Sequence, residues 1–544
     1  MKKYYLKFLE LIKNPVVQII IITACSFFIS FLYFGENLKA KMGIIDDHTY
    51  LRTGVLNDPL LIWKNFINAP EISSFGNSPR FRIIYDLINN IQTTLWGMDA
   101  SSWYLVNIMV FAFFIFCVFY ILYENLGIKW ALPFFLLIIS QKYFAHIFTR
   151  LGTAEVWTIL GLSIYFLSLN SIYQKSKKTI ALFSSWKECL FMILGAIIMI
   201  GSKENFATLG ILVVAFILFL KQKNKLTKTI FFSSIFILSL NMYQVLHIFL
   251  TQRKNGVDFY QNDSGIIVRI MKIMEGAFSG KAFFPSIYFL FFILVLIAYL
   301  ITEIKIRKNK IDKHILNKLF IRPFYIGMML AVFYLFNLYI YNGLFYDSNR
   351  YAFPFVLICQ ILLLVFTRWV YDFWQYYIPK RKFKFLEIVY VCIILGLMFF
   401  LTKNIQYSRK ISSLNVEATA LFQEKIKEMA KIIKRNPKWP VVFSSYAPFD
   451  YEPLISVSYY LKYYVVENDL MVKTYYDSIN LDKDPLLKWV AEENLKFEKD
   501  GWTNFVPYEE NSRNQCFDIN FKKEIIDDRC INLGKIWVLG TYPY

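Results

Sequence analysis

Residues 102–123, SWYLVNIMVFAFFIFCVFYILY, form an apolar run in which no side chain carries a charge. In a helix, a run of this length extends about 33 Å, which is enough to cross the roughly 30 Å hydrocarbon core of a bilayer. Soluble proteins seldom contain uncharged stretches this long. The stretch therefore predicts a transmembrane helix.

Similar runs recur along the chain. Of its 544 residues, 56% are hydrophobic and only 18% are charged, which is more apolar surface than one soluble core can bury. The chain is therefore predicted to be a polytopic α-helical membrane protein with about eleven transmembrane helices. The runs lie near residues 15–34, 102–123, 129–147, 155–173, 188–202, 205–220, 229–250, 284–302, 323–342, 353–372 and 386–404. The first is too long for a signal peptide and lacks a small-residue cleavage site, so an uncleaved span is expected. Gly201–Asn205 indicates a turn between two short spans, and without that turn the count is ten.

The distribution of basic residues predicts the orientation. The formal net charge is +20, and residues 405–544 contain 19 basic and 20 acidic residues, so the whole excess lies in the apolar part. With eleven spans, the basic loops fall on the same side as the N-terminus, and the positive-inside rule makes that side cytoplasmic. These loops are residues 175–178, 221–225, 305–322 and 380–382. The charge therefore sets topology, and no nucleic-acid partner is expected. The location predicted is the inner membrane of a bacterial cell.

Two domains follow from this pattern. Residues 1–404 form the membrane domain, and residues 405–544 form a small α/β domain on the extracytoplasmic side. The tail begins with amphipathic helical spacing and continues into the strand-like Val441–Phe443. Cys516 and Cys530 lie 14 residues apart in this tail. An oxidising compartment permits a disulfide between them, and two free thiols are the alternative.

The first extracytoplasmic loop, residues 35–101, carries the motif Gly43-Ile44-Ile45-Asp46-Asp47-His48. Two stretches of apolar helical spacing follow, near residues 60–67 and 83–95, and both are typical of helices lying in the membrane interface. Adjacent carboxylates repel each other, so Asp46 and Asp47 favour either a raised pKa or a bound cation. Such a pair can accept a proton from an attacking hydroxyl or bind a divalent metal. Alternatively, it is a solvated loop with an aspartate that caps a helix.

Several cations share the predicted outer side with this pair. Arginine grips phosphate with a planar fork and lysine adds a point charge, so converging cations suit a phosphate held at the membrane surface. The candidate phosphate ligands are Arg80, Arg82, Lys203 and Arg350, and the supporting residues are His48, Arg150, Glu155, Glu204 and Tyr351. Each cation taken singly is also compatible with a side chain that snorkels to the interface. Several cations on the extracytoplasmic side, which should be poor in basic residues, favour a binding site.

These residues resemble the GT-C superfamily of membrane glycosyltransferases, which includes the protein O-mannosyltransferases and the aminoarabinose transferase of lipid A. The resemblance rests on Asp46-Asp47 after the first span, the two juxtamembrane helices, Ser202-Lys203-Glu204 and Arg350-Tyr351. It covers roughly residues 1–370 in layout and does not extend to the tail. An acceptor motif of the oligosaccharyltransferase type, such as Trp-Trp-Asp, is not present in the sequence.

The resemblance implies a sugar donor linked to polyprenyl phosphate and inverting transfer to a hydroxyl of a lipid or glycan acceptor in the cell envelope. Arg80, Arg82, Lys203 and Arg350 would neutralise the leaving phosphate. Asp46 is the preferred base, and Asp47 orients the acceptor or binds Mg²⁺ or Mn²⁺, although a site without metal fits equally well.

Other functional classes fit parts of the sequence. A polymerase or ligase of lipid-linked oligosaccharides also has many spans and outward cations, but does not need an acidic pair directly after the first span. A flippase or transporter needs ionisable groups near mid-membrane, and here these groups lie at the outer ends of the spans. A non-catalytic assembly or receptor subunit would use the tail as its working part.

Overall fold

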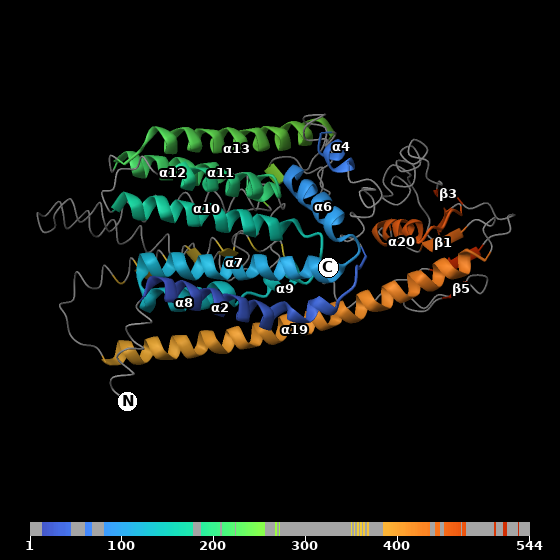
Figure 1. Cartoon of the computed structure of the whole chain (residues 1–544), viewed down its shortest axis with the longest axis horizontal. Coiled ribbons are helices and arrows are strands. Elements are labelled where there is room, and N and C mark those ends of the chain that lie inside the picture. The colour runs from blue at the N-terminus through green and yellow to red at the C-terminus, as the bar shows by residue number, and fades with distance from the viewer. Residues whose placement is uncertain are drawn as a thin grey trace, which may run out of the picture.

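The structure is a computed structural model of the whole chain. It describes residues 14–44, 60–67, 81–177, 186–206, 209–222, 225–255, 384–435, 441–445, 451–468, 470–474, 505–507, 515–518 and 531–532, with isolated residues between 267 and 271 and between 350 and 371. Figure 1 shows a bundle of helices that lie side by side, with a small sheet beyond one end of the bundle.

The described part contains five helices long and apolar enough to cross a membrane. They comprise α2 (Pro15–Phe34) with its short 3₁₀ extension, α7 (Ala100–Leu126), α10 (Ala154–Lys177), the residues Lys228–Ile248 of α13 (Lys228–Asn255), and α19 (Lys384–Ile433) from Glu387 onward. Each coincides with one of the predicted spans. The predicted spans at 284–302 and 323–342 lie outside the described residues, so the count of eleven stays a prediction.

Three shorter helices complete the described bundle: α8 (Ile128–Ile139), α11 (Trp186–Ile200) and α12 (Leu209–Gln222). An aromatic core fixes the packing around α7, where the ring of Phe111 lies 4.9–5.5 Å from those of Tyr33, Phe34, Phe144 and Phe148. Ring pairs at such distances add to the stabilisation that comes from burial.

The predicted span 129–147 is wrong as one continuous helix. The chain leaves α8 at Ser140 and resumes as the short helix α9 (Tyr143–Phe148). Side-chain amides satisfy the carbonyls that this break leaves without helical partners. Asn404 donates to the Ser140 carbonyl at 3.0 Å, and Gln141 donates to the Leu137 carbonyl at 2.7 Å. The polar residues at 140–142 mark the break in the sequence.

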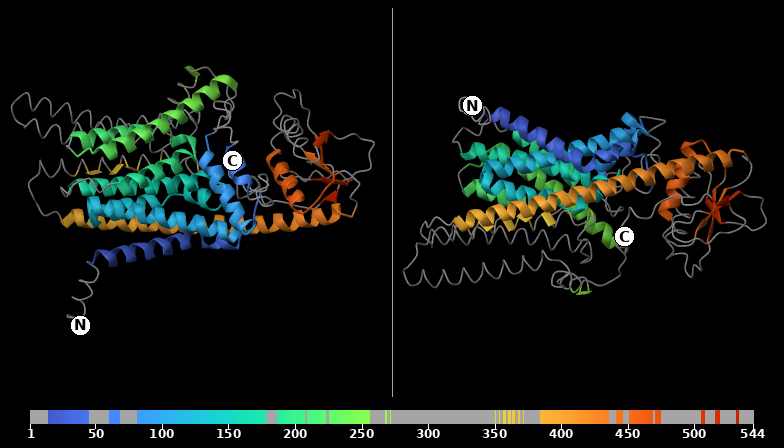
Figure 2. Two further views of the ribbon diagram at one scale, coloured as in Figure 1. Left: turned by 45° about the horizontal axis from the view of Figure 1, so that its top comes forward. Right: turned by 90° about the horizontal axis from the view of Figure 1, so that it is seen from below.

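Helix α19 continues without interruption through residues 404 and 405, where the sequence suggested a domain boundary. Its 50 residues extend about 75 Å, far more than the roughly 30 Å of a hydrocarbon core. Figures 1 and 2 show its far end next to the sheet. One continuous helix therefore belongs both to the bundle and to the C-terminal unit.

The C-terminal unit contains a parallel sheet of five described strands in the order β3-β2-β1-β4-β5. The strands are β1 (Val441–Ser445), β2 (Leu470–Thr474), β3 (Phe505–Pro507), β4 (Gln515–Asp518) and β5 (Ile531–Asn532). Helix α20 (Tyr451–Tyr463) provides the crossover between β1 and β2 that a parallel pair requires.

A second hydrophobic core joins this unit to the first loop. Ala40, Met42 and Ile44 are buried against Phe422 and Ile426 of α19. The same core includes Leu454, Val457 and Tyr460 of α20 and Trp103 and Tyr104 of α7. The segment that leads to the acidic pair is therefore packed between the bundle and the C-terminal unit.

Candidate phosphate-binding site

The candidate site lies at the end of the bundle that faces the C-terminal unit. Helix α4 (Leu61–Ile67) and helix α6 (Ile83–Trp96) lie there, where the apolar spacing indicated two helices in the first loop (Figure 1). Trp63 and Ile67 of α4 are exposed, as are Ile91 and Leu95 of α6. These apolar side chains suit contact with the lipid interface.

Two glycines bring α10 and α11 into direct contact. A Cβ added to Gly161 would lie 2.5 Å from the backbone nitrogen of Met199, and one added to Gly195 would lie 2.6 Å from that of Tyr165. Small residues at a crossing let two helix backbones approach closely in a membrane. This crossing brings the first turn of α10 close to the turn that follows α11.

That close approach forms a buried ion pair. The Lys203 Nζ donates to the Glu155 carboxylate, and both side chains are at most 5% exposed. Arg350 approaches the same carboxylate, with Nε 4.0 Å from Oε1. One buried acid thus faces two cations from different parts of the chain.

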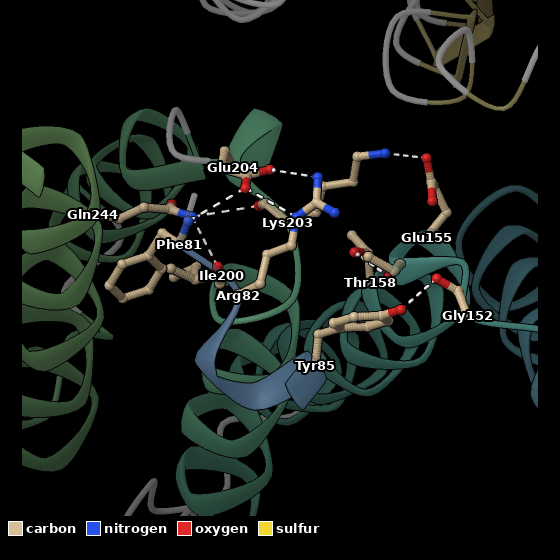
Figure 3. Close-up of polar contacts among 11 residues, drawn as sticks. Phe81, Arg82, Tyr85, Gly152, Glu155, Thr158, Ile200, Lys203, Glu204 and Gln244 are labelled. Carbon is tan, nitrogen blue, oxygen red and sulfur yellow. Dashed lines mark hydrogen bonds and ion pairs between the residues drawn. The ribbon is translucent and has the colours of Figure 1, made fainter. Parts of the chain in front are cut away.

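A second ion pair lies beside the first. The Arg82 guanidinium donates to both oxygens of Glu204, at 3.0 and 3.4 Å, and the Phe81 backbone N–H donates to one of them at 3.3 Å. Burial alone would lower the pKa of Arg82, but the carboxylates of Glu204 and Glu155 hold that pKa above its ordinary value. Arg82 is therefore always charged. Figure 3 shows Arg82 and Lys203 between the two glutamates.

Backbone contacts fix the start of α6 on the turn that carries Lys203. The Gly201 carbonyl accepts hydrogen bonds from the N–H groups of Ile84, at 2.9 Å, and Tyr85, at 3.3 Å. These two groups have no partner within their own helix because they lie in its first turn. The Tyr85 hydroxyl donates to the Gly152 carbonyl at 2.5 Å and ties α6 to the start of α10.

Helix α13 supports the same turn with polar side chains that sequence reasoning missed. Gln244 is fully buried, and its Nε2 donates to the carbonyls of Ile200 at 2.8 Å and Lys203 at 3.4 Å. His247 is also buried, with its ring 5.6 Å from that of Phe81. The signal was present in the sequence, because Asn241, Gln244 and His247 repeat every three residues within an apolar run.

Arg150 and His146 lie on the adjoining segment. Asn107 donates to the Arg150 carbonyl at 3.3 Å, and the Nε2 of His146 lies 3.0 Å from the Tyr407 hydroxyl of α19. His146 is therefore a hydrogen-bond partner of α19 in the described structure.

The structure therefore brings together Arg82, Lys203, Arg350, Glu155 and Glu204, with Arg150 close to His146. The predicted residues Asp46, Asp47, His48, Arg80, Tyr351 and Cys530 lie outside the described part. Cys516 is described only as a backbone position, paired with Val442 in the sheet. Among the described residues no group of three metal-binding side chains occurs. The metal ligand predicted at Asp47 lies outside that part of the chain.

Sequence and structure comparisons complete the description. No family model and no curated protein matches the sequence. Among solved structures, the chain is similar to the crystal structure of ArnT from Cupriavidus metallidurans bound to undecaprenyl phosphate. The TM-score is 0.43 and the sequence identity 10%, with 89% of each chain covered.

Proposed function

We propose that the chain is a membrane glycosyltransferase that moves a sugar from a polyprenyl phosphate carrier to a hydroxyl of a cell-envelope acceptor, on the extracytoplasmic face and with inversion. The observation that carries the proposal is a pair of adjacent salt bridges: Lys203 is bound to Glu155 in a buried pair, and Arg82 is bound to Glu204 in a partly buried one. Arg350 adds a third cation to this arrangement. Three segments far apart in sequence supply these cations.

The cations of this cluster suit a phosphate that gains charge during the reaction. Arg82, Lys203 and Arg350 converge on the carboxylates of Glu204 and Glu155. A sugar phosphodiester carries one negative charge, whereas a phosphate monoester carries about 1.5 to 2 at neutral pH. Cations in this position stabilise the leaving group more than the donor, which is the requirement for catalysis.

The glutamates also explain how such cations tolerate burial before substrate binds. A buried charge without a partner costs several kcal/mol, so each cation needs a counter-ion in the empty protein. Glu155 and Glu204 supply it, and they hold the cations in a fixed arrangement. Fixed donors need no reorganisation when charge develops on the phosphate.

In the proposed reaction, Asp46 takes the proton from the acceptor hydroxyl. The acceptor oxygen then forms a bond to the anomeric carbon from the face opposite the phosphate. The bond between the anomeric carbon and the phosphate oxygen breaks, and its electron pair stays on polyprenyl phosphate beside Arg82 and Lys203. Asp47 orients the acceptor or holds Mg²⁺ or Mn²⁺.

The test is sugar transfer by the purified full-length chain in lipid nanodiscs, with undecaprenyl phosphate sugars as donors. The sugar and the acceptor are identified beforehand by comparing the surface glycans of a deletion strain with those of its parent. Asp46→Asn is expected to reduce the rate by about 10²–10⁴-fold. Glu36→Gln is the matched control, because Glu36 pairs only with the exposed Lys39 and Arg409 among the described contacts.

Full activity of both Asp46→Asn and Asp47→Asn, in protein that folds normally, would refute the transferase assignment. Loss of activity with chelator and recovery with one added metal would assign Asp47 the metal role. Unchanged activity with chelator would assign it the orienting role.

A further inference from the structure

Helix α6 buries several carboxamide side chains and exposes some of its apolar ones. Asn89, Asn90 and Gln92 are at most 4% exposed, whereas Ile91 and Leu95 are 41% and 66% exposed. Surface helices of soluble proteins show the opposite pattern. Lipid contact accounts for the apolar outer face, but it does not account for carboxamides on the buried face.

Asn89 is the residue that needs an explanation. Its Nδ2 and Oδ1 are both buried, and neither has a hydrogen-bond partner in the described part of the protein. A buried carboxamide that loses its bonds to water and gains none destabilises the fold. Two other buried asparagines have partners, since Asn107 donates to the Arg150 carbonyl and Asn404 to the Ser140 carbonyl. The Nδ2 and Oδ1 atoms of Asn89 are therefore able to form hydrogen bonds with a ligand.

The position of Asn89 on α6 connects it to the candidate phosphate-binding site. It follows Tyr85 by four residues and Arg82 by seven, so the three lie on one face of the helix. That face is directed at the start of α10, because the Tyr85 hydroxyl donates to the Gly152 carbonyl. Along the helix axis, Asn89 is about 10 Å beyond Arg82.

The same face leads toward the segment that precedes the acidic pair. At the far end of α6, Trp96 packs on Trp103, with ring centroids 5.9 Å apart. Trp103 belongs to the core that buries Ile44, two residues before Asp46. Asn89 thus lies on a helix that runs from the phosphate-binding cations to the core beside the proposed base.

We propose that Asn89, with Gln92 one turn beyond it, binds hydroxyl groups of the sugar carried on the polyprenyl phosphate. This assignment rests on the proposed function. A carboxamide offers two donors and one acceptor oxygen, which matches hydroxyl groups that both donate and accept. A phosphate needs cations or several donors, and an isoprenoid chain offers no hydrogen bonds. In the proposed reaction the sugar lies between the phosphate and the base. Asn89 likewise lies between the cations and the core beside Asp46.

The experiment compares two kinds of carrier with the full-length chain in nanodiscs. Binding is measured for undecaprenyl phosphate and for a panel of undecaprenyl phosphate hexoses, N-acetylhexosamines and pentoses. The unaltered protein is expected to bind at least one sugar-bearing carrier more tightly than undecaprenyl phosphate. Asn89→Leu, which is close in size, is expected to reduce that preference about tenfold and to leave the affinity for undecaprenyl phosphate unchanged.

Asn404→Leu is the matched control, because it removes a buried amide that already has a partner in the protein. It is expected to lower the thermal midpoint and to keep the preference for the sugar. Asn89→Leu breaks no described hydrogen bond of the protein, so its thermal midpoint should not fall. If Asn89→Leu does not fold, Gln92→Leu provides the same binding comparison.

An unchanged sugar preference in the folded variants overturns the assignment. Equal affinity of the unaltered protein for every carrier overturns it as well, while leaving the phosphate site intact. Absence of binding to undecaprenyl phosphate itself contradicts the proposed function, and the assignment of Asn89 fails with it.

Discussion

The Tyr460 hydroxyl donates a 2.7 Å hydrogen bond to the carbonyl of Gly43, which lies 417 residues earlier in the chain. Gln423 of α19 donates to the neighbouring Met42 carbonyl at 2.8 Å. Asp46 follows three residues after Gly43. The C-terminal unit therefore fixes the backbone that leads directly to the acidic pair.

Tyr460→Phe is expected to lower the turnover rate about fivefold, because one buried hydrogen bond of about 1 kcal/mol no longer holds the Gly43 carbonyl. Donor affinity should stay unchanged, since Tyr460 does not contact the cations in the described structure. Sugar transfer measured as separate kcat and KM values checks this. Tyr463→Phe, at a side chain that is 43% exposed, is the control. A change in KM alone would contradict a positioning role.

Glu155→Gln is expected to destabilise the protein by about 3–5 kcal/mol, because Lys203 loses its carboxylate while remaining buried. Unfolding by denaturant in detergent micelles measures the change. Combining Glu155→Gln with Lys203→Met should recover much of that loss, since the buried charge that lost the Glu155 carboxylate is then removed.

The pair between Lys175 and Glu188 provides the comparison for this prediction. Its Nζ–O distance is 2.6 Å, but the lysine side chain is 35% exposed. Glu188→Gln should therefore cost only about 0–1 kcal/mol. Equal costs for the two glutamates would show that burial does not set the strength of the Glu155 pair.

Arg82→Lys is expected to weaken binding of undecaprenyl phosphate about tenfold, because an ammonium lacks the planar fork that now engages both oxygens of Glu204. Affinity for the carrier in nanodiscs checks this. Arg409→Gln removes a more exposed arginine of α19 and should leave the affinity as it is. Full retention of carrier affinity in Arg82→Lys would exclude Arg82 from the phosphate site.

Gly161→Ala is expected to destabilise the bundle by about 1–3 kcal/mol, because its methyl group would collide with the backbone of α11. Activity should fall as well, since the crossing sets the approach of Lys203 to Glu155. Thermal unfolding and sugar transfer measure the two effects. Gly396→Ala on α19 meets no atom within 4 Å and should instead stabilise by about 0.5–1 kcal/mol. Similar effects at both glycines would show that the helix crossing is not responsible.

Much of the fold follows from the sequence because transfer of apolar side chains from water to lipid depends on local composition. The composition of residues 102–123 is by itself enough to predict a helix in lipid, and these residues lie within α7 (Ala100–Leu126). The break after α8 is harder to predict from the sequence. Hydropathy averaged over 129–147 hides the polar residues 140–142, and the Asn404 amide that donates to the Ser140 carbonyl belongs to a helix distant in sequence.

The sequence by itself also determined which side chains were candidates for the phosphate-binding site, since cations and acids at the ends of apolar runs are easily recognised. Only the tertiary structure decided their partners: Glu155 is 48 residues from Lys203, and Arg82 is 122 residues from Glu204. Packing likewise decides that the Asn89 amide has no hydrogen-bond partner among the described residues and that the Tyr460 hydroxyl donates to the Gly43 carbonyl. Burial in lipid is a sum over neighbouring residues, whereas an ion pair or hydrogen bond requires atoms within about 3 Å, which only the folded chain provides.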